Sequence, residues 1–209
     1  MRVTQETKQE TRRRILDAAR KLFAENGLEN TTTRAIALEA KIATGTLFNY
    51  FPNKEAIAMT FVSEALGEAK GDFRRRCRGD ESLEEDCFAL AIAGFRRLTP
   101  CRHLVGGVIE AALGPFSKGE ANPEAEAVRT EHLETVAELL AAHGITVPLS
   151  PVAIHLYWTL YLGALGFWAA DASPNQEETL AVLDQSMRLF VASLSPNSQE
   201  TEVPDGTGT

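Results

Sequence analysis

Apolar positions recur at helical spacing along almost the whole chain. The first helix is predicted from a capping box at Thr7, with its apolar stripe ending at Phe23 and a stop at Gly27. Two short helices are predicted next, over 33–40 and 44–50, and Asn53 is placed to cap a long helix. Further helices are predicted over 82–99, 101–113, 123–143, 151–170 and 175–194. Because no strand pattern emerges, we expect an all-α fold of about nine helices.

One of these helices is apolar on all sides. Residues 152–170 contain a single histidine and no charged side chain, and this segment is long enough for a membrane span. However, no basic residue flanks the segment closely and no second such segment exists, so we expect no membrane partner. We predict instead a helix covered by its own domain and by a second copy of the chain. Paired with the amphipathic helix at 175–194, it would form a four-helix interface whose candidate residues are Trp168, Leu183, Met187 and Phe190.

The charge is distributed unevenly along the chain. The net charge is −8 over 209 residues, but residues 1–54 carry 10 Lys and Arg against 6 Asp and Glu, a net charge of +4. The remaining residues carry 11 against 23, a net charge of −12. A basic end on an acidic body indicates that any polyanion contact is confined to the N-terminal region. The 3 cysteines lack zinc or disulfide-framework spacing, and no secretory signal precedes the first helix. We therefore expect a cytoplasmic protein without a metal or cofactor.

The first three helices carry the functional signal. A supporting helix, a turn and a second short helix have the arrangement of a helix-turn-helix, in which the second short helix enters the major groove of DNA. Thr44, Gly45 and Thr46 are small enough for a close approach to DNA, and the side chains of Asn49 and Tyr50 can reach phosphates or base edges. Lys54 adds a cation at the start of the next helix. The alternative is a three-helix corner that only packs, with these side chains in water.

The motifs of residues 11–51 resemble the DNA-binding domain of the TetR family of transcriptional regulators. The resemblance rests on ILDAARKLFAENG, TTTRAIA, GTLFNYF and the following NKEAI. It implies an all-α homodimer that binds a palindromic DNA operator, usually as a repressor, and responds to a small-molecule effector in the body. It also implies a DNA-binding domain at 9–69, an effector and dimerisation domain at 70–195, and a tail at 196–209 that we expect to be disordered.

The resemblance also assigns roles to single residues. Three positions depart from the family pattern. Phe48 replaces a common tyrosine, and Lys41 occupies a position where a turn glycine is usual. Ala43 replaces a frequent serine cap, and Thr44 can take over the role of that cap. The resemblance implies DNA contacts by Thr33, Arg34, Thr44, Gly45, Thr46, Phe48, Asn49, Tyr50 and Lys54.

The effector site is predicted from aromatic content alone. Aromatic and histidine side chains of the body can line an apolar cavity between helices, the usual place for a ligand in such bundles. Most of them serve equally well as plain core, and the identity of the effector stays open. The candidates are Phe88, Phe95, His103, Phe116, Tyr157, Trp158 and Tyr161, with His155 as a further polar anchor.

Three other functions compete with a ligand-responsive regulator. An enzyme would use Cys101 and His103, with His132, but the spacing of the first two predicts that they face different sides of a helix. A thiol-based redox regulator would use Cys77 and Cys87. A structural DNA-binding protein would need no effector.

Overall fold

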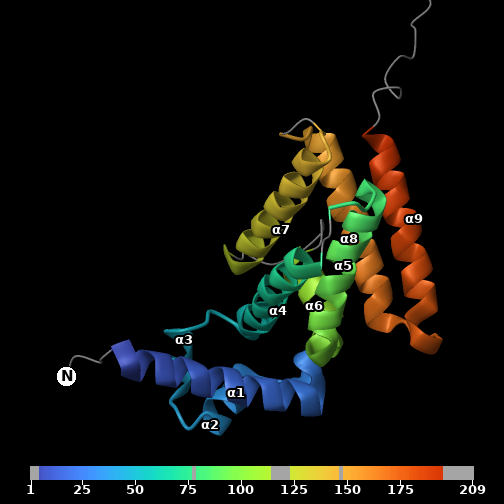
Figure 1. Ribbon diagram of the computed structural model, residues 1–209. Helices are drawn as coiled ribbons and strands as arrows, with labels where there is room; N and C mark the ends of the chain where they lie inside the picture. Colours follow the sequence, from blue (N-terminus) through green and yellow to red (C-terminus); the bar gives the residue numbers. More distant parts are fainter. Residues whose placement is uncertain (1–4, 77–78, 114–122, 146–147, 195–209) are drawn as a thin grey trace, which may run out of the picture.

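The computed structural model is all-helical over the residues it describes, which are 5–76, 79–113, 123–145 and 148–194 (Figure 1). This confirms the predicted all-α class. The predicted disordered tail at 196–209 lies outside the described residues. The elements in chain order are α1 (Gln5–Asn30), α2 (Thr33–Glu39), α3 (Thr44–Phe48), α4 (Lys54–Arg76), α5 (Leu83–Leu98), η1 (Thr99–Cys101), α6 (Arg102–Val108), η2 (Ile109–Leu113), α7 (Pro123–Ala142), α8 (Pro151–Ala170), η3 (Pro174–Gln176) and α9 (Glu177–Ser193).

Most of the predicted helix ends are confirmed by side-chain caps. The Thr32 hydroxyl accepts a hydrogen bond from the Ala35 N–H at 3.1 Å, and the Asn53 side chain accepts one from the Ala56 N–H at 2.8 Å. Ser82 and Glu85 form a reciprocal capping box. These bonds satisfy N–H groups that have no carbonyl partner in the first turn of a helix. The predicted cap at Thr7 is wrong, because α1 already includes that residue.

The head consists of α1, α2 and α3 packed on the first half of α4 (Figure 1). α1 is kinked at Gly27, whose φ of 76° lies in the left-handed region that glycine adopts most easily. Burial of apolar side chains from all four helices stabilises this unit by about 1.5–3 kcal/mol for each large side chain. Its fully buried members include Ile15, Phe23, Ile36, Leu47 and Ile57.

The body is built on the second half of α4. α4 packs along α5 and α7, and α9 packs along α8 and also directly against α5 (Figure 1). α4 runs unbroken through residues 69 and 70, where the sequence suggests a domain boundary, so head and body share one continuous helix. The acidic charge of Asp171, after α8, is held by hydrogen bonds from Ser173 and Thr179.

The predicted interface residues Trp168, Leu183, Met187 and Phe190 are buried within the single chain, at no more than 1% exposure. Their assignment to a dimer interface is therefore wrong, since side chains covered by their own body cannot contact a partner. Periodicity identified an apolar face of each helix but not which neighbour covers it. Exposed apolar side chains lie elsewhere on the same helices, and they include Phe167 on α8 and Leu189 on α9.

α8 is the one described helix whose length and apolar character would suffice to cross a membrane, a test that core helices also pass. Its aromatic face is buried in the body, where Tyr157 and Tyr161 are at most 1% exposed. The same helix leaves Val152 and Phe167 exposed, at 77% and 40%. The packing therefore accounts for one face of α8 and leaves another apolar face uncovered.

Candidate nucleic-acid interface

The turn between α2 and α3 is held from α1. Lys41 adopts a left-handed backbone conformation with φ of 55°, which explains why related turns favour glycine here. The Arg14 guanidinium donates hydrogen bonds to the carbonyls of Ala40 and Lys41, the latter at 3.0 Å. The Ile42 N–H donates to the Ala37 carbonyl at 3.0 Å. These bonds fix the angle between the two short helices despite the strained lysine.

α3 presents almost all of its surface to the outside. Leu47 is its one buried residue, whereas Gly45, Phe48 and Asn49 are exposed and Thr44 and Thr46 are half-buried. Ala43 occupies the N-cap position without a side-chain hydrogen bond, so Thr44 does not replace the missing cap. The predicted DNA-reading residues therefore remain on the outer face of the head.

Gly45 is not required by packing inside the head. Among the described residues, no atom outside its immediate neighbours lies within 4 Å of the position a Cβ would occupy there. Glycine in a short helix costs about 1 kcal/mol relative to alanine. The open space lies on the exposed side of α3, where a close approach by an external partner would account for the missing side chain.

Lys54 lies where the head meets the first turn of α4, and its ammonium group is already engaged. Its Nζ donates hydrogen bonds to the carbonyls of Leu28 and Glu29, at 2.8 and 2.9 Å. These carbonyls follow the kink in α1, so Lys54 joins the two helices. An ammonium group has three N–H donors, which leaves one for a phosphate.

Most of the cations on α1 serve the head itself. The guanidinium of Arg12 lies 5.4 Å from the ring centre of Phe51, and Lys21 pairs with Glu39 at 2.8 Å. Arg34 is exposed in the first turn of α2, with Thr33 half-buried beside it. Part of the head's positive charge therefore stabilises the packing of the head itself. Arg34 on α2 and Lys41 in the turn before α3 are exposed cations.

Tyr50 follows α3 and packs half-buried against the core, while Phe51 behind it is buried. The aromatic pair ties the end of α3 to the head. The structure thus brings the nine predicted DNA-binding residues onto or beside α2 and α3 and the start of α4, and their contacts with DNA remain predictions.

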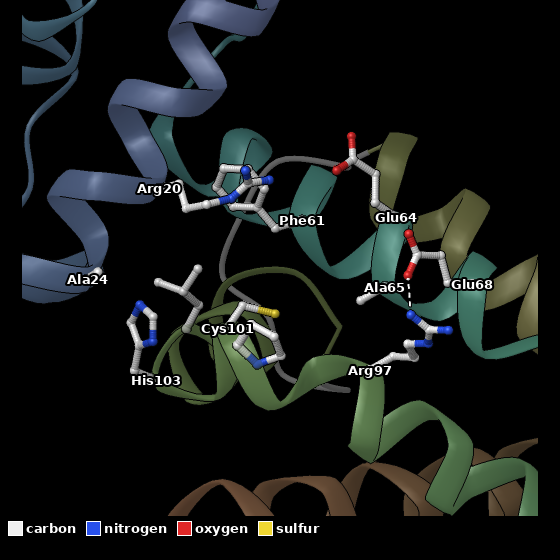
Figure 2. Close-up of a pocket in the computed structure, with 11 residues that line it drawn as sticks. Arg20, Ala24, Phe61, Glu64, Ala65, Glu68, Arg97, Cys101 and His103 are labelled. Atoms are coloured by element: carbon white, nitrogen blue, oxygen red, sulfur yellow. Dashed lines mark hydrogen bonds and ion pairs between the residues drawn. The ribbon is translucent and has the colours of Figure 1, made fainter. Parts of the chain in front are cut away.

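A pocket of about 240 Å³ lies at the junction of head and body (Figure 2). Figure 2 shows Arg20 from α1 over the ring of Phe61 from α4, with a guanidinium-to-centroid distance of 4.9 Å. Cys101 and His103 border the same pocket, contrary to the expectation that they face different sides. His132, the third residue considered for an enzyme, does not line this pocket, whereas the carboxylates of Glu64 and Glu68 do.

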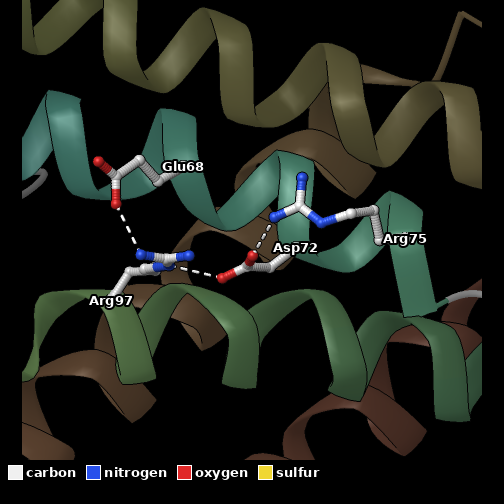
Figure 3. Close-up of polar contacts among 4 residues, drawn as sticks. All are labelled: Glu68, Asp72, Arg75 and Arg97. Carbon is white, nitrogen blue, oxygen red and sulfur yellow. Dashed lines mark hydrogen bonds and ion pairs between the residues drawn. The ribbon is translucent and has the colours of Figure 1, made fainter.

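An ion-pair network joins α4 to α5 beside that pocket (Figure 3). Arg97 on α5 contacts Glu68 at 2.8 Å and Asp72 at 2.5 Å, and Arg75 also donates to Asp72. The hydrogen bond from Arg97, followed by its charge and by the contact with Arg75, lowers the pKa of Asp72 to about 2. These exposed charges hold the shared helix against the body.

The predicted effector residues do not form one site. Phe95, Tyr157, Trp158 and Tyr161 gather in a buried aromatic cluster with His132 from α7. Periodicity placed His132 on an apolar helix face, but only the tertiary structure shows its Nε2 2.8 Å from the Tyr157 hydroxyl. The remaining candidates are separate from this cluster or cannot be placed.

Phe88 borders a different pocket, of about 200 Å³, with Phe73 and Arg96. His103 borders the pocket between head and body, and His155 is exposed, so neither is a polar anchor in the aromatic cluster. Phe116 lies outside the described residues. The prediction of one shared cavity is therefore wrong for Phe88 and His103, because Phe88 lies two turns before Phe95 on α5, beside Phe73 of α4, and His103 lies beside the head.

The described cysteines are poor candidates for redox sensing. Burial raises the pKa of the Cys87 thiol to about 12 and also raises the pKa of Cys101. A protonated, buried thiol is a weak nucleophile. Cys77, the other half of the predicted redox pair, lies outside the described residues.

A helix-turn-helix head with an exposed second helix, joined to an all-α body, defines a class of DNA-binding transcriptional regulators. Residues 15–59 match the family model described as bacterial regulatory proteins, tetR family. The HTH-type transcriptional regulator UidR of Escherichia coli (strain K12) is 29% identical over 133 residues, which cover 64% of each chain, just under two thirds of that relative's length. The fatty acid metabolism regulator protein of Bacillus subtilis (strain 168) is 38% identical over 73 residues, 33% of this chain and 38% of that protein.

Solved structures match over most of the chain. FadR of Thermus thermophilus, described as a TetR family transcriptional repressor in complex with lauroyl-CoA, is 25% identical with a TM-score of 0.67, covering 94% of this chain and 100% of that one. A TetR regulator from Rhodococcus sp. RHA1 shares the fold at 21% identity, with a TM-score of 0.68 and coverage of 90% and 100%. The family model, the curated relatives and the solved structures all indicate a TetR family transcriptional regulator. Its relatives are regulators, and no enzymatic family is indicated.

Proposed function

We propose that the protein is a repressor that binds a palindromic operator as a homodimer and leaves it when a small, largely apolar effector binds the body. The outer face of α3 carries this proposal. α3 has Leu47 as its only buried residue, Arg14 holds the turn before it, and the buried Phe51 anchors the chain after it, so the helix is fixed in an orientation that can enter a major groove. The open position at Gly45 gives its N-terminal end room to approach the bases.

The homodimer is supported by apolar surface on α8 and α9. Leu156 and Leu160 are half-buried and Phe167 is 40% exposed, and their spacing of four and seven residues places them on one side of α8. On α9, Leu189 is 53% exposed and Val182 lies seven residues before it on the same side. Two copies of the chain would cover these faces and hold two heads at a fixed distance, as a palindrome requires.

The effector class follows from the body and from one relative. The buried aromatic cluster around His132 contains few polar groups, which favours a largely apolar ligand. The structure of Thermus thermophilus FadR holds lauroyl-CoA, so fatty acyl thioesters are the first class to test. A bound molecule would release the operator by shifting α4, which head and body share.

Selection of bound DNA from random sequence, followed by footprinting, tests the proposal. A single protected palindrome with two half-sites about one helical turn apart supports a dimeric regulator. Diffuse coating of the duplex would instead indicate a structural DNA-binding protein. The footprint is then repeated with lauroyl-CoA, and the proposal expects protection to be lost.

A further inference from the structure

The Tyr161 hydroxyl is a buried polar group for which the described residues supply no hydrogen-bond partner. Tyr161 is 1% exposed. The polar groups of the adjacent rings are satisfied, since the Tyr157 hydroxyl meets His132 Nε2 at 2.8 Å and the Trp158 Nε1–H donates to the Leu113 carbonyl at 3.3 Å. Arg129, whose guanidinium lies 5.8 Å from the Trp158 ring centre, also has a buried Nε without a partner among the described residues. Burying a hydroxyl without a partner is costly, so such a group needs an explanation.

The space in front of this hydroxyl is bordered by α4 and α5. A Cβ placed on Gly94 would lie 3.5 Å from the Tyr161 hydroxyl and 3.2 Å from Leu66 Cδ2. Gly94 on α5 and Leu66 on α4 are therefore both next to this hydroxyl. Leu66 also borders a small pocket of about 20 Å³ between α4 and α7, together with His132. That volume holds one water molecule at most. A larger molecule reaches Tyr161 from this side only if Leu66 moves.

The groups at the inner end of this route are uncharged. The His132 ring centre lies 4.3 Å from that of Tyr161, and burial lowers the pKa of His132 to about 4, which leaves the imidazole neutral near pH 7. Lys70 and Glu131, which carry opposite charges, line the small pocket with His132. A carboxylate brought to Tyr161 would lose its hydration, and the rings in contact with Tyr161 are all uncharged. An uncharged acceptor avoids that penalty and satisfies the hydroxyl.

We propose that Tyr161 and His132 form the polar end of the effector site, and that the effector presents an uncharged carbonyl group to them, as an acyl ester or thioester does, whose oxygen accepts a hydrogen bond from the Tyr161 hydroxyl. The molecule enters between α4 and α7 and displaces Leu66. The rings of Tyr157 and Trp158 pack against its apolar part. The assignment rests on the proposed ligand-responsive function and specifies the chemistry of its site.

A matched pair of probes tests the chemistry. Methyl decanoate and decanoate have the same acyl chain, but only the first is uncharged at pH 7. Tryptophan fluorescence reports binding without DNA, because one of the 2 tryptophans, Trp158, has its ring 5.7 Å from that of Tyr161. We expect saturable binding of the ester and at least about 10-fold weaker binding of the anion, because the anion must be desolvated.

Two tyrosine variants on the same helix test the anchor. Tyr161→Phe should weaken ester binding about 3- to 10-fold, the loss of one hydrogen bond, while the Tm of the free protein stays unchanged or rises. Tyr157→Phe is the matched control, because it removes a hydroxyl that has a partner and should lower the Tm. A hydroxyl with a purely structural role would not combine lost affinity with retained stability.

Three results would overturn the proposal: no saturable binding of the ester, decanoate bound as tightly as the ester, or Tyr161→Phe with wild-type affinity. A lower Tm in Tyr161→Phe would also overturn it, since the hydroxyl would then have a structural partner such as a single water. Operator release is measured separately by gel shift. If the ester binds as expected but the operator stays bound, the site stands and the ligand-responsive function fails.

Discussion

Lys54 offers a test of how one side chain can serve both the fold and DNA. Lys54→Met keeps most of the aliphatic stem and removes the ammonium group, which donates to the carbonyls of Leu28 and Glu29 at 2.8 and 2.9 Å. A hydrogen bond from a charged group contributes about 1.5–3 kcal/mol when it is shielded from water. Lys54 is half-buried, so we expect the two bonds together to contribute about 2 kcal/mol.

This loss should lower the Tm by about 4–8 °C for a chain of this size. Thermal and urea unfolding measure it. Arg74→Met is the control on the same helix, because Arg74 pairs with Glu138 at 2.6 Å between side chains that are 59% and 57% exposed. Such surface pairs contribute less than about 1 kcal/mol. Equal stability losses in the two variants would refute the structural role of Lys54.

The role of Lys54 in DNA binding is tested by the salt dependence of the affinity for DNA. If the third N–H of Lys54 binds a phosphate, Lys54→Met weakens binding to all sequences alike, and the slope of log K against log salt falls by about 1. Titrations between 50 and 200 mM salt measure this slope, on protein held well below its Tm. An unchanged slope beside a lower Tm would show that Lys54 acts through the fold alone.

The other predictions concern the head, the dimer and the thiols. Thr44→Ala should change which operator sequence is preferred rather than affinity overall, and selection from random DNA measures this; a uniform loss would place Thr44 on the backbone instead. Ala43→Ser should add the missing cap of α3 and stabilise the head by about 1 kcal/mol in urea unfolding, and no gain would mean that another group already caps it. Leu189→Glu should halve the mass seen by light scattering, whereas Leu38→Glu, which alters a 79% exposed residue of the head, should leave it at twice the chain mass. The Cys87 thiol, whose pKa is raised to about 12, should resist alkylation at pH 8 in the folded protein and react only as the pH approaches that value; fast labelling at pH 8, measured by mass spectrometry, would contradict its burial.

Local sequence was sufficient to predict the helices and the exposed position of α3. Helix caps such as Thr32, Asn53 and Ser82 act within three residues, so the sequence could predict them before the structure showed them. The same holds for the left-handed conformation at Gly27. The outward position of Gly45 also followed from short-range spacing, because the burial of Leu47 in a five-residue helix leaves Gly45 and Phe48 exposed.

The tertiary structure decided which groups meet across the chain. Apolar periodicity cannot tell a residue buried in its own body from one covered by a partner, which is why Phe190 was assigned to the wrong surface. The predicted phosphate-binding Lys54 and the basic Arg14 hold the head together through carbonyls about 26 residues away, a relation absent from any local pattern. The pairing of His132 with Tyr157, and the lack of such a partner for Tyr161 among the described residues, likewise depend on how α7, α8 and α4 pack. Sequence determined the faces of the helices, while only their packing determined what each face contacts, because burial is a property of neighbours distant along the chain.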